Sequence, residues 1–149
     1  MGFETAENIR EEHQAIGLFC RIVSGDPEFQ GQYSCFDAIV HRGEKQPLVV
    51  EAKCRPGIYT KYPDGLKVSL HKWHSLIAES IRRKSRPIMM VYDKANQMML
   101  YTTVSKEIVD HLVTMRRKYD GIREPAVFVK WSHFHKVAII TGANNVVRQ

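Results

Sequence analysis

An aspartate, a glutamate and a lysine of this sequence are spaced so that their side chains can meet on two paired strands. Glu51 and Lys53 are two residues apart, so in a strand they share one face while Ala52 points into the packing on the other. Residues 41–46 are turn-forming and allow the strand that carries Glu51 to fold back beside the strand that carries Asp37. We therefore expect the two carboxylates to converge.

Converging carboxylates have a specific chemical use. Mg²⁺ prefers octahedral oxygen coordination, keeps several waters, and takes one or two carboxylates together with phosphate oxygens of a substrate. The ammonium of Lys53 would orient a metal-bound water or offset charge that develops on the phosphate. The alternative is a salt bridge between Glu51 and Lys53. Val49 and Val50 place Glu51 at the end of a buried strand, where a carboxylate needs a partner such as a metal or Lys53.

A helix followed by a hairpin with this acid and acid-X-lysine pattern resembles the core of the PD-(D/E)XK nuclease superfamily. The resemblance extends from the first helix through the strand that ends near Asp93. It implies that Asp37 and Glu51 bind a divalent metal, that the carbonyl of Ala52 adds a ligand, and that Lys53 is the catalytic lysine. Mg²⁺ is the expected cofactor, and Mn²⁺ would substitute for it.

The chain departs from the family pattern just before the first acid. Phe36 precedes Asp37 where the family has a proline, but this position varies and contributes no chemistry. A literal Pro63-Asp64 pair occurs later in the chain, and no acid-X-lysine on a plausible strand follows it. We interpret this pair and Gly65 as a turn.

The first helix of the family often supplies a further acid, and here Glu12 is the candidate. Thr5 can cap a helix that runs to about Val23, with apolar residues at helical spacing. Glu12 lies beside this apolar stripe, whereas Glu11 points further out. We expect Glu12 to be an accessory catalytic acid, and the alternative is an ordinary solvated carboxylate.

The irregular segment 54–65 leaves the predicted site and mixes basic with aromatic side chains. Arg55, Tyr59 and Lys61 are expected to grip phosphates or to stack on an exposed base. The alternative is that the tyrosines pin the loop to the body of the protein.

A second helix is predicted over residues 67–84, and Trp73 belongs to its core stripe. Lys67, His71 and His74 form a neighbouring row on this helix, which we interpret as phosphate contacts. Lys72 points elsewhere on the predicted helix and is a poorer candidate. A transition-metal site at His71 and His74 is only weakly supported, because no third ligand is in view.

The remaining segments complete an α/β fold, with a mixed central sheet flanked by helices, a restriction-endonuclease-like core and an additional C-terminal hairpin. Strands are predicted over residues 88–92 and 98–104. A third helix is predicted after Ser105, with Ile108, Leu112, Met115 and Tyr119 on one face. The last hairpin is predicted to pair residues 126–131 with residues 135–140. We expect one nuclease domain over residues 1–149.

The charge distribution favours a polyanionic partner. The chain has a net charge of +6, but residues 1–31 carry −4 and the remainder +10. Such asymmetry indicates a basic face for nucleic acid, although a basic surface also serves solubility. The three cysteines show no C-x-x-C pairing, and no apolar run is long enough to span a bilayer. These features predict a cytoplasmic protein in a reducing compartment.

The sequence thus predicts a Mg²⁺-dependent DNA endonuclease. The order of Glu12, Asp37, Glu51 and Lys53 resembles archaeal-type Holliday-junction resolvases, which recognise structure, but restriction and homing endonucleases, which read sequence, share the same core. Cutting two strands symmetrically requires two sites, so a homodimer or larger homo-oligomer is expected. A non-catalytic nucleic-acid-binding module with a basic face is the alternative. A zinc site built from Cys35, Cys54 and histidines is a more distant one.

Overall fold

Two sheets and two long helices make up the computed structural model, which describes residues 6–31, 34–117, 119–140 and 145–148. The larger sheet has seven strands in the order β1-β2-β3-β5-β6-β9-β10. Its strands are β1 (Asp26–Phe29), β2 (Ala38–Arg42), β3 (Lys45–Cys54), β5 (Arg86–Asp93), β6 (Met98–Thr103), β9 (His135–Ile140) and β10 (Asn145–Arg148). β3 and β5 are parallel and the other neighbours are antiparallel, so the sheet is mixed.

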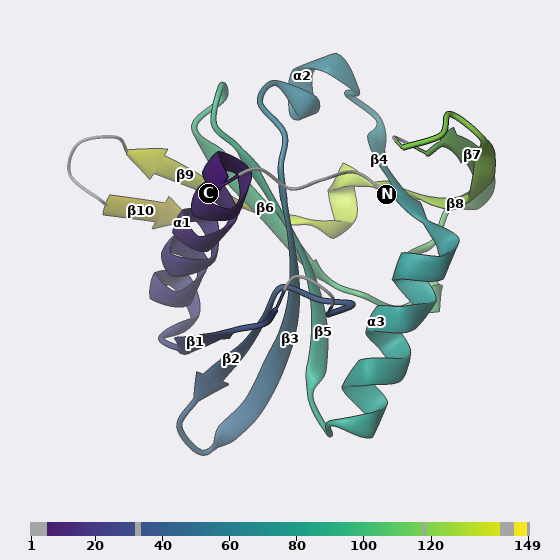
Figure 1. The fold of residues 1–149 in the computed structure, drawn as a ribbon. Helices are drawn as coiled ribbons and strands as arrows, with labels where there is room; N and C mark the ends of the chain where they lie inside the picture. The colour runs from purple at the N-terminus through teal and green to yellow at the C-terminus, as the bar shows by residue number, and fades with distance from the viewer. Residues whose placement is uncertain (1–5, 32–33, 118, 141–144, 149) are drawn as a thin grey trace.

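The helices α1 (Ala6–Val23) and α3 (Leu70–Arg82) lie on opposite sides of the larger sheet (Figure 1). A smaller sheet of β4 (Gly65–Ser69), β8 (Arg123–Lys130) and β7 (His111–Arg116), in the order β4-β8-β7, lies on the α3 side. The connections contain α2 (Ile58–Lys61) and the 3₁₀ turns η1 (Lys106–Ile108) and η2 (Trp131–His133). This mixed sheet with helices on both faces confirms the predicted fold class.

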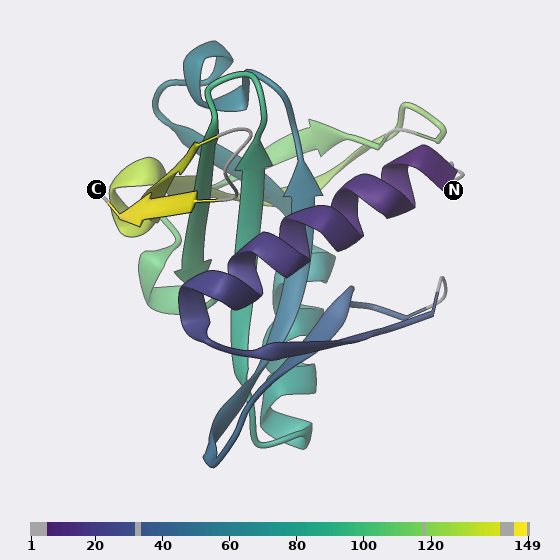
Figure 2. The same ribbon diagram turned by 90° about the vertical axis from the view of Figure 1, so that its left-hand side faces the viewer.

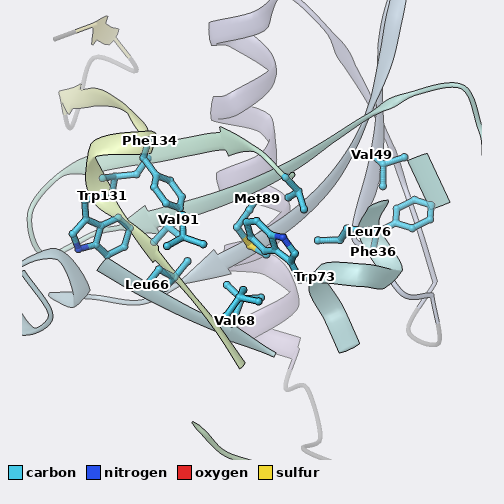
Figure 3. Close-up of a cluster of buried hydrophobic side chains, with 14 of the residues drawn as sticks. Phe36, Val49, Leu66, Val68, Trp73, Leu76, Met89, Val91, Trp131 and Phe134 are labelled. Carbon is cyan, nitrogen blue, oxygen red and sulfur yellow. The ribbon is translucent and has the colours of Figure 1, made fainter. Parts of the chain in front are cut away.

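Each face of the sheet has its own core, because successive side chains of a strand point to opposite faces. On the α1 side, Ile16 and Phe19 pack against Val50 and Met90. On the α3 side, Val49, Met89 and Val91 pack with Trp73 and with residues of the small sheet (Figure 3). Trp73 is 1% exposed, as its predicted place in the core requires.

The elements predicted before residue 105 are largely confirmed. α1 ends at Val23, while its expected cap, Thr5, lies outside the described residues. β5 and β6 confirm the strands predicted at 88–92 and 98–104. No helix in the described part of the chain is both long and apolar enough to cross a membrane.

The second predicted helix begins three residues later than expected. Residues 65–69 form β4, and Ser69 caps α3 by accepting a hydrogen bond at its Oγ from the Lys72 N–H (3.4 Å). Leu66 and Val68 alternate inward and face Val129 and Val127 of β8. This alternation, not the helical spacing, describes residues 65–69, and it places Lys67 on a strand.

Gly65 is required where β4 meets β8. A Cβ atom there would lie 2.3 Å from the Val129 carbonyl oxygen and 3.0 Å from the Lys130 Cα. Backbone atoms cannot move aside as a flexible side chain can, so the close approach of the two strands depends on glycine at this position.

The predicted third helix is wrong. Residues 106–108 form only η1, and residues 111–116 form β7, which pairs with β8. Leu112, expected in the core, is 65% exposed. The apolar residues at helical spacing have no core to pack against, and residues 111–116 pair with β8 as a strand instead.

The predicted last hairpin is also wrong in its pairing. Both strands exist as β8 and β9, but β8 belongs to the small sheet and β9 to the large one. η2 carries the chain between the sheets and buries Trp131 and Phe134 at the crossing. A C-terminal hairpin is present, formed instead by β9 and β10.

Candidate active site

The β2–β3 hairpin brings Asp37 against the strand that carries Glu51. The Asp37 N–H donates to the Val50 carbonyl (2.9 Å), and Asp37 Oδ2 accepts from the Ala52 N–H (2.7 Å). The half-buried Asp37 carboxylate is therefore held beside the peptide that joins Glu51 to Ala52. Its position is fixed by backbone groups, so little ordering remains to be done when a ligand binds.

Glu51 is a buried acid with a perturbed pKa. Its side chain points to the α3 face, since the flanking Val50 and Ala52 belong to the α1-side core. Burial, and next the charge of Asp37, raise the pKa of Glu51 to about 7, while Lys72 and Lys53 act in the opposite direction. A buried carboxylate beside a second carboxylate calls for positive charge.

Lys72 supplies part of that charge from α3. Its Nζ lies 3.4 Å from Glu51 Oε1 and donates to the Cys35 carbonyl oxygen (3.0 Å). The Lys72 side chain is 31% exposed and that of Glu51 12%. The pair thus lies at the border between the interior and solvent.

The prediction that Lys72 points away from this site is wrong. The buried residues of α3 are Trp73, Leu76 and Ser80, whereas Ile81, at helical spacing from Trp73, is 73% exposed. Lys72 lies four residues before Leu76 and therefore on the buried side of α3.

Lys53 lies on the same face of β3 as Glu51, and its charge lowers the pKa of that acid. Ala52 points into the α1-side core, as expected from strand alternation, and its N–H is used by Asp37. The ligand role of the Ala52 carbonyl and the catalytic role of Lys53 stay predictions.

Glu12 lies on the α1 side of the sheet. After burial itself, the charges of Glu12 and Glu11 are the largest causes that raise the pKa of Cys54 to about 12. Cys54 follows Lys53 on β3 and packs with the α1-side core. Within the described residues, no three or more His, Cys, Asp or Glu side chains gather to hold a metal. The accessory role of Glu12 stays a prediction.

The donor set fits Mg²⁺. Asp37 and Glu51 provide hard carboxylate oxygens, and Mg²⁺ is bound through one or two carboxylates because it keeps most of its waters. Burial, and next the charge of Asp37, raise the pKa of Glu51, so a divalent cation beside the two carboxylates would stabilise their charged forms.

The loop after β3 is held in place by Asp93. This carboxylate is fully buried and accepts hydrogen bonds from the Gly57 N–H (2.7 Å), the Tyr59 N–H (3.0 Å) and the Asn96 side chain (2.8 Å). Burial raises the pKa of Asp93, but these hydrogen bonds outweigh it and lower the pKa overall. The α2 loop is therefore held by a charge at the end of β5, a role that was not predicted from the sequence.

The predicted nucleic-acid residues of this loop have different surroundings. Tyr59 packs on Trp131 with ring centroids 5.6 Å apart, and its hydroxyl accepts a hydrogen bond from Lys136. Such packing matches the alternative in which this tyrosine pins the loop. Lys61 is exposed, and Arg55 donates to the Cys54 carbonyl (3.0 Å), so both present charge near the end of β3.

The predicted row on α3 is broken at its first member. Lys67 is an exposed residue of β4, opposite Phe128 of β8. His71 and His74 are exposed on α3 and line an open groove with Glu124 and Pro125. The two histidines remain neighbours, but Lys67 does not extend their row.

The arrangement as a whole is a restriction-endonuclease-like fold with its acid and acid-X-lysine hairpin at the centre of the sheet. A solved structure shares this fold: Archaeoglobus fulgidus Hjc, described as a Holliday junction resolvase from an archaeal hyperthermophile. The two superpose with a TM-score of 0.55 at 10% sequence identity, over 83% of this chain and 88% of the Hjc chain. No protein-family model and no curated protein matches the chain. The resemblance inferred from the motif is therefore confirmed at the level of the fold.

Proposed function

We propose that this protein is a Mg²⁺-dependent DNA endonuclease whose single nuclease domain hydrolyses phosphodiester bonds. The observation that carries the proposal is the convergence of Asp37 with the buried Glu51 on a hairpin that also presents Lys53, on this fold. The fold likeness to a Holliday junction resolvase favours a structure-specific enzyme that acts on branched DNA over one that reads a sequence.

Asp37, Glu51 and the Ala52 carbonyl would hold the metal. When bound, Mg²⁺ polarises a phosphate oxygen and acidifies a water. Lys53 Nζ would hold the attacking water by a hydrogen bond and offset charge that develops on the scissile phosphate. Lys72 Nζ, anchored on the Cys35 carbonyl, would keep Glu51 in its charged form. In-line attack would leave 5′-phosphate and 3′-hydroxyl ends.

The DNA would be held outside the metal centre by Arg55, Lys61, His71 and His74, which are exposed or half-exposed around β3 and α3. Lys67 and Tyr59 are weaker candidates, the first because it lies on β4 and the second because it packs on Trp131. One such site cuts one strand, so a symmetric cut at a junction requires a homodimer or larger homo-oligomer.

The proposal is tested by cleavage of supercoiled plasmid and of a synthetic four-way junction, each in Mg²⁺ or in EDTA. Glu51→Ala and Lys53→Ala are compared with Glu44→Ala and Lys45→Ala, which change exposed residues of the same hairpin. We expect metal-dependent cutting, preferentially of the junction, that only the first two changes abolish. Binding of DNA without cutting of either substrate would instead support the non-catalytic binding module.

A further inference from the structure

The β7–β8 ribbon stands out from the rest of the molecule by its exposure. All β7 side chains are exposed or half-exposed, because β7 forms the edge of the small sheet. Leu112, Tyr119 and Ile122 are 65%, 54% and 56% exposed. Large apolar side chains that are exposed along one short ribbon are candidates for a binding surface.

The last rung of the ribbon sets two like charges against each other. Arg116 and Arg123 are directly opposed in the β7–β8 ladder. Like charges in directly opposed positions destabilise a strand pair. Arg123 donates to Thr114 Oγ1 (3.2 Å), but among the described residues neither arginine pairs with an acid. The pair costs stability in the free protein, and an anion placed between the two arginines would remove that cost.

The tip of the ribbon is ordered by its own contacts. Arg117 donates to Asp120 (2.6 Å), and its backbone bonds to Ile122 and Gly121 close the turn (2.9 Å each). The Arg117 guanidinium lies 5.1 Å from the centre of the Tyr119 ring. Asp120 is therefore paired with Arg117. Arg116 and Arg123 remain as the exposed positive charges of the last residue pair of the ladder.

The ribbon projects to the same side of the molecule as the outer end of β1, from which the chain continues to Asp37. In Figure 2 its tip (light green) lies on the same side as the N-terminal end of α1 (purple) and the outer end of β1 (dark blue). The chain reaches Asp37 from that end of β1, because the Gln30 N–H already bonds to the Asp37 carbonyl (2.9 Å). DNA seated at the proposed site would extend past the ribbon.

We propose that the β7–β8 ribbon is an arm that binds the DNA substrate. Arg116 and Arg123 bind the sugar-phosphate backbone, and Tyr119 and Ile122 rest against bases that are unstacked at a branch. The arm deepens the proposed function, on which it rests for the identity of the ligand. Arginine suits phosphate because its planar guanidinium offers paired donors, and an exposed aromatic ring stacks on any base.

The test is fluorescence-anisotropy binding to a labelled four-way junction and to a duplex, in EDTA and over a range of salt concentrations. Arg116→Ala/Arg123→Ala is compared with Lys94→Ala/Lys106→Ala, which removes the same charge from exposed residues outside the ribbon. We expect the arginine variant to lower affinity for both DNAs about tenfold and to reduce the salt slope by about 1 to 2. The conservative Arg116→Lys/Arg123→Lys variant should restore the slope.

Tyr119→Ala/Ile122→Ala should weaken junction binding about tenfold while duplex binding changes less, because only a branch offers unstacked bases. If Arg116→Ala/Arg123→Ala and the control Lys94→Ala/Lys106→Ala show equal DNA affinities and equal salt slopes, the proposal that the ribbon binds DNA is wrong. A tip variant that turns an oligomer into a monomer and keeps its junction preference would also overturn the proposal, since the ribbon would then contact a second copy. Circular dichroism confirms that each variant is folded.

Binding in EDTA separates this proposal from the nuclease. A wild type that binds through the ribbon but never cuts would contradict the proposed function and leave the arm intact. If the wild type cuts DNA and neither ribbon variant changes the DNA affinity, the proposed nuclease function is supported and the DNA-binding role of the ribbon is wrong.

Discussion

The site around Glu51 and the β7–β8 ribbon both concentrate charge, but they handle it in opposite ways. At Glu51 the charges are buried or half-buried and of both signs, with Asp37 and Glu51 near Lys53 and Lys72. On the ribbon, Arg116 and Arg123 are exposed and opposed to each other. A buried charge must be compensated within the protein or by a bound ion, whereas an exposed one tolerates a like neighbour because water screens it.

The difference separates the proposed catalytic region from the proposed binding region. A small cation would supply the positive charge that the Glu51 site needs, and a polyanion would supply the negative charge that the ribbon needs.

Glu51→Ala should reduce cleavage by at least about 100-fold, since it removes a proposed metal ligand. The ribbon variant Arg116→Ala/Arg123→Ala should cut at the wild-type rate once DNA is saturating. Single-turnover cleavage of a junction at high enzyme concentration measures both. Equal losses in the two variants would erase the distinction between a chemical and a binding region.

Glu51 should make the protein less stable as the pH rises. Its pKa is about 7 when folded, above the ordinary value of 4.5, so its ionisation opposes folding. The stability associated with this group is complete below pH 4.5 and is lost as the pH passes through 7. The loss amounts to at most about 3 kcal/mol.

Urea unfolding at pH 5 and pH 8 measures that loss. Glu51→Gln should flatten the profile, while Glu44→Gln should leave it unchanged, because Glu44 is exposed. Mg²⁺ added at pH 8 should restore stability to the wild type and not to Glu51→Gln. A wild-type profile as flat as that of Glu51→Gln would contradict the perturbed acid.

Lys72→Met should cost about 1 to 2 kcal/mol at pH 8 and less at pH 5, because it leaves Glu51 with less positive charge only when the acid is ionised. Lys67→Met is the matched control, since Lys67 lies exposed on β4. The measurement is chemical unfolding at both pH values. A loss at Lys67 equal to that at Lys72 would contradict a stabilising ion pair between Lys72 and Glu51.

Arg116→Glu should weaken DNA binding and slightly stabilise the free protein, by about 0.2 to 1 kcal/mol. The glutamate would oppose Arg123 with a complementary charge, which relieves the repulsion on the last rung. Thermal unfolding and anisotropy on one preparation check both effects. A variant that loses stability and binding together would indicate that Arg116 is structural.

Sequence reasoning was sound where local pattern and tertiary pairing agree. Alternation on β3 correctly separated Glu51 from Ala52, and the turn at 41–46 correctly paired β2 with β3. Both features depend only on residues near in the chain. The short strand β1 was not predicted, since its side chains are exposed and carry no apolar alternation.

The predicted start of the second helix is wrong because the apolar residues near Leu66 fit both a helix and a strand. Leu66 fits the helical stripe that continues through Leu70 and Trp73, and it equally fits a strand with Val68. Only the pairing with β8, some sixty residues along the chain, decides for the strand. The start of α3 follows from that distant contact.

The positions of Asp37, Glu51 and Lys72 along the chain suggest an order in which their contacts form during folding. Asp37 and Glu51 are joined by a short hairpin, which forms early because its ends are close in the chain. Lys72 reaches them only after the long crossover between the parallel β3 and β5 has closed. The two acids therefore meet with only Lys53 beside them, before Lys72 arrives. We expect folding at alkaline pH to be slow and to be accelerated by divalent ions. Such ions would offset the negative charge of Asp37 and Glu51 before Lys72 packs beside them.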